Sequence, residues 1–172
     1  QPFCDGNVGT WGPSALGQQQ FRTAEAAPPH LRCAVPMVSG FGWRYGTFHP
    51  GGVLRDEYVR TIDRLGFGAG ALIREHPLDD VVWKFVARAA APERVAVPTL
   101  MIGGWYDLHA DEMPADFAAL VARSAPEVRD AHRLVLGPWT HHFTTSYAAG
   151  AAAAYDAATL GVARAEVAAW FR

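Results

Sequence analysis

Residues 8–21 read VGTWGPSALGQQQF, and this stretch decides the fold. Residues 7–12 have the apolar and β-branched content of a strand, whereas residues 15–27 are rich in Ala, Gln and Glu, which favour a helix until two prolines end it. Ser14 lies between the two segments, with a glycine on either side of the turn. The stretch therefore predicts a strand, a sharp turn and a helix, with a serine hydroxyl at the turn.

The alternation of strand and helix continues further along the chain. Short apolar runs bounded by turn residues predict strands at residues 31–35, 99–104 and 133–137. Helices are predicted at residues 111–123 and 148–171. The first of these helices has an inward face of four residues, Met113, Phe117, Leu120 and Val121. Strands separated by helices predict an α/β fold, a mostly parallel sheet with helices on both faces.

Residues 37–96 differ in composition from the rest of the chain, with many glycines and aromatic residues. Helix-like segments at 54–65 and 78–90 suggest an inserted helical cap within a single domain over residues 1–172. On the second segment one apolar side is formed by Val81, Val82, Phe85, Val86 and Ala89. The run GFGAGA at 66–71 matches a dinucleotide fingerprint poorly, because no strand precedes it and the glycine spacing is wrong, so we expect a loop between helices.

Composition bounds the class of protein. The 172 residues are half apolar, which is enough for one packed core, and the formal net charge is −2 with a single lysine, so a nucleic-acid partner is not expected. Charged residues interrupt every run before the roughly 18 apolar residues that a membrane helix requires. Two cysteines, Cys4 and Cys33, are too few for a disulfide framework. The compartment stays open, with the cytoplasm favoured, and self-association also stays open.

Three polar residues come within a few positions of the ends of predicted strands. They are Ser14, Asp107 and His141, in that order along the chain. In a parallel sheet the carboxyl ends of the strands meet at one edge, where functional groups collect. A serine needs a neutral imidazole to accept its proton, and the imidazole needs a carboxylate to fix its tautomer. The order Ser, Asp, His after a strand-turn-helix is the one that α/β-hydrolases use.

Other interpretations of these residues stay open. Ser14 could be an ordinary turn serine, and Asp107 could cap the following helix. His142 competes with His141, because adjacent side chains at a strand end point in different directions. Two adjacent histidines rarely bind one metal ion, so no metal site and no cofactor is expected. Five further histidines are expected to be surface or hydrogen-bonded loop residues: His30, His49, His76, His109 and His132.

The serine turn departs from the usual G-x-S-x-G pattern. Leu16 stands where the second glycine is expected, and the glycine comes one residue later, at Gly17. Gly12 lets the helix pack closely behind the turn. The small Ala15 leaves its backbone N–H free for an oxyanion, a contact that can contribute about 3–4 kcal/mol in a transition state. A second donor is not identifiable from the residues.

Together these motifs resemble a known family. G-x-S-x-x-G at 12–17 opening a helix that leads to PPHL, GGWYD at 103–107, GPWxH at 137–141 and a closing AWF at 169–171 are similar to the CocE/NonD hydrolases, a family of serine esterases and X-Pro dipeptidyl peptidases. The resemblance extends over nearly the whole chain. It implies an α/β-hydrolase core, here its C-terminal half only, with the cap at about 37–96.

The resemblance also implies residue roles. Ser14 becomes the nucleophile, Asp107 the orienting acid and His141 the base, while Trp105 and Tyr106 shape the acid loop. Trp139 and Trp43 are further candidates for substrate contact, although Trp139 and Trp105 could instead be core aromatic residues beside glycine-rich loops. Four aromatic residues in the cap form either a substrate-facing wall or a small core of the cap: Phe41, Trp43, Tyr45 and Phe48. The family usually has tyrosine after the serine, where this chain has Ala15.

The family pattern includes segments that this sequence does not show. Several strands, with a tyrosine that completes the oxyanion hole, precede the serine in the family, and a jelly-roll domain follows the closing helix. We therefore expect a piece of a longer protein. The predicted function is hydrolysis of a small-molecule ester or amide through an acyl-enzyme. Ester cleavage is favoured because no acidic anchor for a peptide amino terminus is present. The alternatives are an X-Pro dipeptidyl-peptidase and a non-catalytic remnant.

Overall fold

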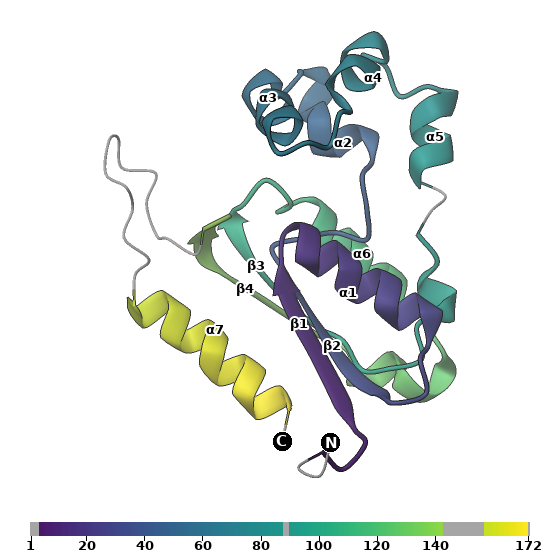
Figure 1. Ribbon diagram of the computed structural model, residues 1–172, viewed down its shortest axis with the longest axis vertical. Coiled ribbons are helices and arrows are strands. Elements are labelled where there is room, and N and C mark those ends of the chain that lie inside the picture. Colours follow the sequence, from purple (N-terminus) through teal and green to yellow (C-terminus); the bar gives the residue numbers. More distant parts are fainter. Residues whose placement is uncertain (1–3, 88–89, 143–156, 172) are drawn as a thin grey trace. The chain divides into compact units, whose positions relative to one another are not determined.

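In the computed structural model, residues 4–87, 90–142 and 157–171 are described (Figure 1). The chain divides into two compact units, one formed by Gln1–Phe41 with Ala91–Arg172 and the other by Gly42–Ala90. We call the first the sheet unit and the second the helical unit. The helical unit lies within the segment predicted to be a cap. None of the described helices combines the length and the apolar character needed to span a bilayer.

The sheet unit is built on four parallel strands. They are β1 (Val8–Pro13), β2 (Leu31–Met37), β3 (Leu100–Tyr106) and β4 (Arg133–Thr140), in the spatial order β1-β2-β3-β4. Each predicted strand is present, and each continues beyond its predicted end. Because the strands are parallel, all four carboxyl ends lie at one edge of the sheet.

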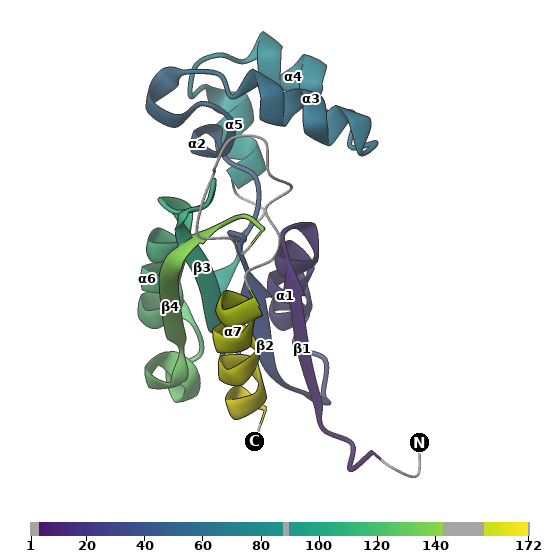
Figure 2. The ribbon, with the colours of Figure 1, turned by 90° about the vertical axis from the view of Figure 1, so that its left-hand side faces the viewer.

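Helices cover both faces of this sheet, as predicted. The strands alternate their side chains between the faces. Ile102 packs in a cluster that includes Ala163 and Val167 of α7 (Ala157–Trp170), whereas the neighbouring Gly103 is approached by Met113 of α6 (Glu112–Arg123). The helix α1 (Ala15–Ala26) packs on β1 and β2. Figure 2 shows α7 in front of the strands and α1 behind them. Residues 148–156 of the predicted last helix lie outside the described residues.

Three side chains of the sheet unit bind the backbone at Phe41 and Ala91, where the chain leaves this unit and returns to it. Arg22 and Glu25 of α1 form an ion pair of 2.7 Å. Arg22 donates to the Phe41 carbonyl at 2.9 Å, and Glu25 accepts from the Ala91 N–H at 2.8 Å. Asp116 of α6 accepts from the Phe41 N–H at 2.8 Å. Helices on the sheet therefore fix both segments. Phe41 was predicted to join the aromatic cluster of the cap, which is wrong, because it stacks on Phe21 of α1 and belongs to the sheet unit.

The helical unit has a core of its own. Its elements are α2 (Tyr45–Phe48), the 3₁₀ turn η1 (Pro50–Gly52), α3 (Asp56–Arg64), α4 (Gly70–Glu75) and α5 (Val81–Ala87). Phe48, Val59, Ile62, Ile73 and Trp83 are buried together, with Trp43 and Tyr45 packed against them. The predicted glycine run at 66–71 is a loop between α3 and α4, with positive φ at Gly66 and Gly68, and α4 begins at its end.

The apolar side predicted for α5 is buried only in part, because Val82 and Val86 are half-buried but two other members are not. Val81 and Phe85 are 76% and 74% exposed, whereas Trp83, between them, is 3% exposed. The Trp83 indole N–H donates to the His76 carbonyl at 2.8 Å, and its ring meets the rings of Tyr45 and Phe48. A large aromatic residue with a partner for its polar atom gains more from burial than valine does, and it sets the rotation of this short helix. Ala89 lies outside the described residues.

A buried histidine ties β3 and β4 together at the edge opposite their carboxyl ends. His132 is 2% exposed, its Nδ1 accepts the Thr99 N–H at 3.2 Å, and its Nε2 lies 2.9 Å from Ser124 Oγ. An amide can only donate, so Nδ1 carries no proton and Nε2 donates to Ser124. Burial, with the charge of Arg133, lowers the pKa of His132 below its usual value of 6.5.

This histidine predicts a loss of stability in acid. The unfolded chain takes up a proton at His132 below about pH 6.5, whereas the folded chain resists it, so stability falls as pH falls through this range. For one proton the slope is at most about 1.4 kcal/mol per pH unit. Thermal denaturation between pH 5 and 8 should show a shallower slope for His132→Gln than for wild type. Equal slopes for His132→Gln and wild type would contradict the assignment.

Candidate active site

Ser14 occupies a strained turn at the carboxyl end of β1. It is the single residue between Pro13 of β1 and Ala15 of α1, and its φ of 55° and ψ of −124° lie where non-glycine residues are rare. Such a conformation costs about 1–3 kcal/mol and persists only where surrounding contacts enforce it. Here the Ser14 N–H donates to the Met37 carbonyl at 2.9 Å. The turn therefore holds the serine rigidly at the edge where the strands end.

The hydroxyl of Ser14 does not serve the helix that follows it. Ser14 stands at the N-cap position of α1, but its side chain makes no capping hydrogen bond. Its Oγ instead lies 3.0 Å from Nε2 of His141. A plain turn serine would be expected to cap α1, so the turn interpretation does not explain this geometry.

Gly17 explains why the serine motif has its second glycine one residue late. A Cβ at Gly17 would lie 2.6 Å from Ser39 Cβ and 2.9 Å from the Met37 carbonyl oxygen. These atoms belong to the end of β2 and the residues after it. The glycine therefore permits the close approach of α1 to β2 that seats the serine turn.

Gly17→Ala is expected to destabilise the protein by roughly 1–3 kcal/mol, because a methyl group is forced against backbone that cannot move freely. This loss exceeds the gain of up to about 1 kcal/mol that alanine brings to a helix interior. Thermal or urea denaturation measures the difference. Gly46→Ala, at a helical glycine with nothing within 4 Å of the added carbon, should not destabilise. A Gly17→Ala protein as stable as wild type would refute the packing argument.

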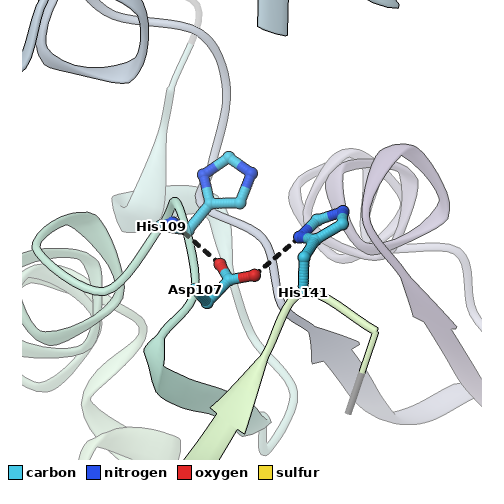
Figure 3. A group of neighbouring side chains, drawn as sticks. All are labelled: Asp107, His109 and His141. Atoms are coloured by element: carbon cyan, nitrogen blue, oxygen red, sulfur yellow. Dashed lines mark hydrogen bonds and ion pairs between the residues drawn. The ribbon is translucent and has the colours of Figure 1, made fainter. Parts of the chain in front are cut away.

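Asp107 follows β3, and its side chain is fully buried. Its Oδ1 accepts the His109 N–H at 2.7 Å, and its Oδ2 lies 2.6 Å from His141 Nδ1 (Figure 3). Burial alone would raise the pKa of Asp107, but the hydrogen bond from His141 and the charges of His141 and His109 outweigh it, so the pKa lies below its usual value. The N-cap of α6 is Asp111, so Asp107 does not cap that helix.

His141 connects the carboxylate to the serine. It comes directly after β4, and its side chain is 21% exposed. Asp107 can only accept, so Nδ1 of His141 donates to it and Nε2 is free to accept from the Ser14 hydroxyl. His142 lies edge-on to His141 with ring centroids 5.7 Å apart, and its N–H donates to Thr140 Oγ1. The structure thus brings Ser14, His141 and Asp107 into one chain of hydrogen bonds.

A cation is the other conceivable occupant of this cluster. Asp107, His109 and His141 offer ligand atoms that all lie within 4.8 Å of one another. However, Oδ2 of Asp107 and Nδ1 of His141 already pair with each other, and Nε2 of His141 already meets Ser14. A cation would have to break these contacts, so the hydrogen-bonded arrangement is the better account of the cluster.

The aromatic residues named as candidate substrate contacts differ in exposure. Trp105 and Tyr106, at the end of β3, are 60% and 56% exposed. Trp139 is buried in the core cluster against β3 and α7. Trp43 packs on Phe48 and Phe67 inside the helical unit. Packing is therefore observed for Trp139 and Trp43. Substrate contact stays a prediction for these two residues and for Trp105 and Tyr106.

Two residues beside the site were missed by the sequence reasoning. His109, expected on the surface or in a hydrogen-bonded loop, is 3% exposed, and its Nδ1 lies 2.7 Å from Oε2 of Glu112, which is also buried. The signal available was the spacing Asp-x-His-x-x-Glu at 107–112, because residues three apart at a helix start face each other. Of the other histidines, His49 and His132 are buried as well.

Comparison with known proteins decides the family. The sequence model of a family described as X-Pro dipeptidyl-peptidase (S15 family) matches residues 1–91 and 68–142, which together make up most of the chain. The chain belongs to this family. Cocaine esterase from Rhodococcus sp. (strain MB1 Bresler) is 27% identical over 190 aligned positions, covering 82% of this chain. The resemblance drawn from the motifs is therefore confirmed.

Solved structures show the same fold for this member of the S15 family. An aminopeptidase from a marine sediment archaeon, Thaumarchaeota archaeon, superimposes with a TM-score of 0.52 at 22% identity, covering 81% of this chain and 30% of that chain. Alpha/beta hydrolase domain-containing protein 10 from mouse gives a TM-score of 0.54 at 12% identity, covering 98% and 63%. The predicted α/β-hydrolase core is confirmed. The chain spans about a third of the length of cocaine esterase.

Proposed function

We propose that this chain carries the catalytic centre of a serine hydrolase that cleaves a small ester or amide through an acyl-enzyme. The observation that supports the proposal most strongly is the continuous contact of Ser14 Oγ, His141 and Asp107, at 3.0 and 2.6 Å. Three segments far apart in the sequence contribute these groups at one sheet edge. Membership of the S15 family supports the same chemistry.

The first half-reaction transfers the acyl group to Ser14. Its Oγ attacks the substrate carbonyl carbon while Nε2 of His141 takes the hydroxyl proton, and Asp107 stabilises the imidazolium that forms. The carbonyl oxygen becomes an oxyanion. The N–H of Ala15, the first of α1, is the proposed donor, because the first amides of a helix have no partner within the helix. Breakdown of the intermediate expels the alcohol or amine, which receives the proton from His141.

The second half-reaction frees the serine. Water attacks the acyl carbon while His141 accepts one of its protons, and collapse of the second intermediate returns a proton to Ser14 Oγ. The carboxylic acid leaves and the site is restored. Trp105 and Tyr106, exposed at the end of β3, are the proposed substrate contacts beside the acid.

An X-Pro dipeptidyl-peptidase is the second candidate, and the description of the matched family favours it. A peptidase of this kind must recognise a peptide amino terminus, which a simple esterase need not do. The two candidates differ in the leaving group and in this recognition, so a pair of substrates separates them.

The test compares a p-nitrophenyl ester with an Ala-Pro p-nitroanilide, using purified protein. The proposal predicts turnover of at least one substrate, with the ester hydrolysed faster. A larger kcat/KM for the anilide would support the peptidase. No turnover of either substrate, together with no reaction with a fluorophosphonate, would identify a folded but non-catalytic remnant and contradict the proposal.

A further inference from the structure

A second buried pair of histidine and carboxylate adjoins the proposed triad. Nδ1 of His109 lies 2.7 Å from Oε2 of Glu112, and the two side chains are 3% and 7% exposed. Removing such groups from water is costly, so a buried pair of this kind is a weak source of stability in itself. Its position suggests a different use, because it occupies the turn between β3 and α6 that begins with Asp107.

The pair is linked to Asp107 through the backbone of His109. The His109 N–H donates to Oδ1 of Asp107 at 2.7 Å, which leaves Oδ2 for His141. The same turn is closed by the Ala110 N–H, which donates to the Asp107 carbonyl at 3.2 Å. The His109 carbonyl in turn accepts the N–H of Glu112 at 3.0 Å. His109, whose N–H donates to Asp107, is therefore held by hydrogen bonds at its ring, its carbonyl and its N–H.

The ring of His109 also lies beside the proposed base. The centroids of the His109 and His141 rings are 5.9 Å apart, with the rings tilted by 46°. Figure 3 shows His109 on one side of the Asp107 carboxylate and His141 on the other. A carboxylate held at one oxygen only can rotate about its last bond, whereas Asp107 is held at both. Hydrogen bonds to both carboxylate oxygens keep Oδ2 of Asp107 in line with Nδ1 of His141.

We propose that His109 and Glu112 are positioning residues of the hydrolytic site. Their buried pair holds the His109 amide on Asp107, and Asp107 then keeps His141 in line with Ser14. The inference rests on the proposed function, because it concerns the rate of the same reaction. It assigns no contact with substrate to either residue.

Glu112→Ala tests the inference, because it leaves the His109 ring without its anchor. The expected result is a fall in kcat of about 10- to 100-fold, the scale of effect that misplacing a catalytic group by about 1 Å produces. KM should change by less than about twofold, since the substrate contacts stay in place. Glu112→Gln retains an acceptor oxygen for Nδ1 and should restore most of the rate.

Ser124→Ala is the matched control. It removes another buried histidine contact, the 2.9 Å bond to His132, at the opposite end of the strands. This variant should lower the melting temperature while kcat stays at the wild-type value. If Glu112→Ala behaves in the same way, with lower stability and unchanged kcat, the pair is only structural and the inference is overturned.

The double variant His109→Phe with Glu112→Leu keeps the test decisive if Glu112→Ala does not fold. Replacing both members of a buried pair by apolar residues of similar volume is often neutral for stability. The inference predicts a folded protein with reduced kcat, and an unreduced kcat would overturn it. A wild-type protein that neither reacts with a fluorophosphonate nor hydrolyses an ester would instead remove the proposed function. If the wild type is active and the double variant is equally active, the proposed function stands and only the positioning role is contradicted.

Discussion

Ser14→Ala is expected to lower kcat/KM for an activated ester by about 10⁴-fold or more, because removal of the nucleophile of a serine triad leaves only binding and oxyanion contributions. Ser14 presents this hydroxyl on a turn with a strained backbone. It does not cap α1, and its Oγ contacts His141. Alanine removes only this hydroxyl, so the fold should survive. Initial rates of p-nitrophenyl ester hydrolysis and a melting curve measure the two effects.

Ser39→Ala supplies the matched control for this experiment. Ser39 also follows a strand of the sheet, β2, but it is fully buried and its hydroxyl donates to the Gly40 carbonyl at 3.1 Å. Loss of that hydroxyl should change kcat/KM by less than about threefold, since a buried neutral hydrogen bond contributes to stability by only about 1 kcal/mol. A Ser14→Ala protein with more than a tenth of the wild-type rate would place the nucleophile elsewhere.

Asp107→Asn should lower kcat by about 10³- to 10⁴-fold while the protein stays folded. The carboxylate accepts from Nδ1 of His141 and so keeps Nε2 unprotonated for Ser14. An asparagine amide group can donate to Nδ1 instead, which moves the ring proton to Nε2 and removes the base. Steady-state rates at saturating ester give the effect. Asp111→Asn, at the exposed N-cap of α6, should stay within about threefold of the wild-type rate.

The pH dependence provides a second measure of Asp107. Because His141 and His109 hold its pKa below the usual 3.8, the carboxylate is ionised throughout the neutral range. A group with a lowered pKa stabilises the fold above its unfolded value and loses this contribution as pH falls through the folded one. Asp107→Asn should therefore flatten the acid limb of the stability curve below about pH 4. An unchanged acid limb would contradict the ionised, hydrogen-bonded carboxylate.

Local patterns in the sequence were sufficient to predict the four strands of the sheet and their order along the chain. The strand, turn and helix around Ser14 are each encoded by adjacent residues. The observed ends of β1 and α1 differ from the predicted ends by no more than one residue. Parallel strands bring their carboxyl ends to one edge whatever their loops contain. The meeting of Ser14, Asp107 and His141 followed from that topology together with the family motifs.

Other features depend on packing that sequence patterns do not encode. The rotation of α5 is set by Trp83, whose indole reaches the His76 carbonyl, and apolar periodicity favoured Val81 and Phe85 instead. The burial of His109 with Glu112 likewise depends on a tertiary setting, because the same spacing on an exposed helix would be an ordinary surface pair.

Labelling with a fluorophosphonate followed by peptide mass mapping tests the central claim most directly. A fluorophosphonate phosphonylates an activated serine oxygen and releases fluoride, so the adduct marks the nucleophile itself. The account predicts one adduct per chain, located on Ser14 and absent after His141→Ala. An adduct on another residue, or a folded protein that acquires none, would contradict it.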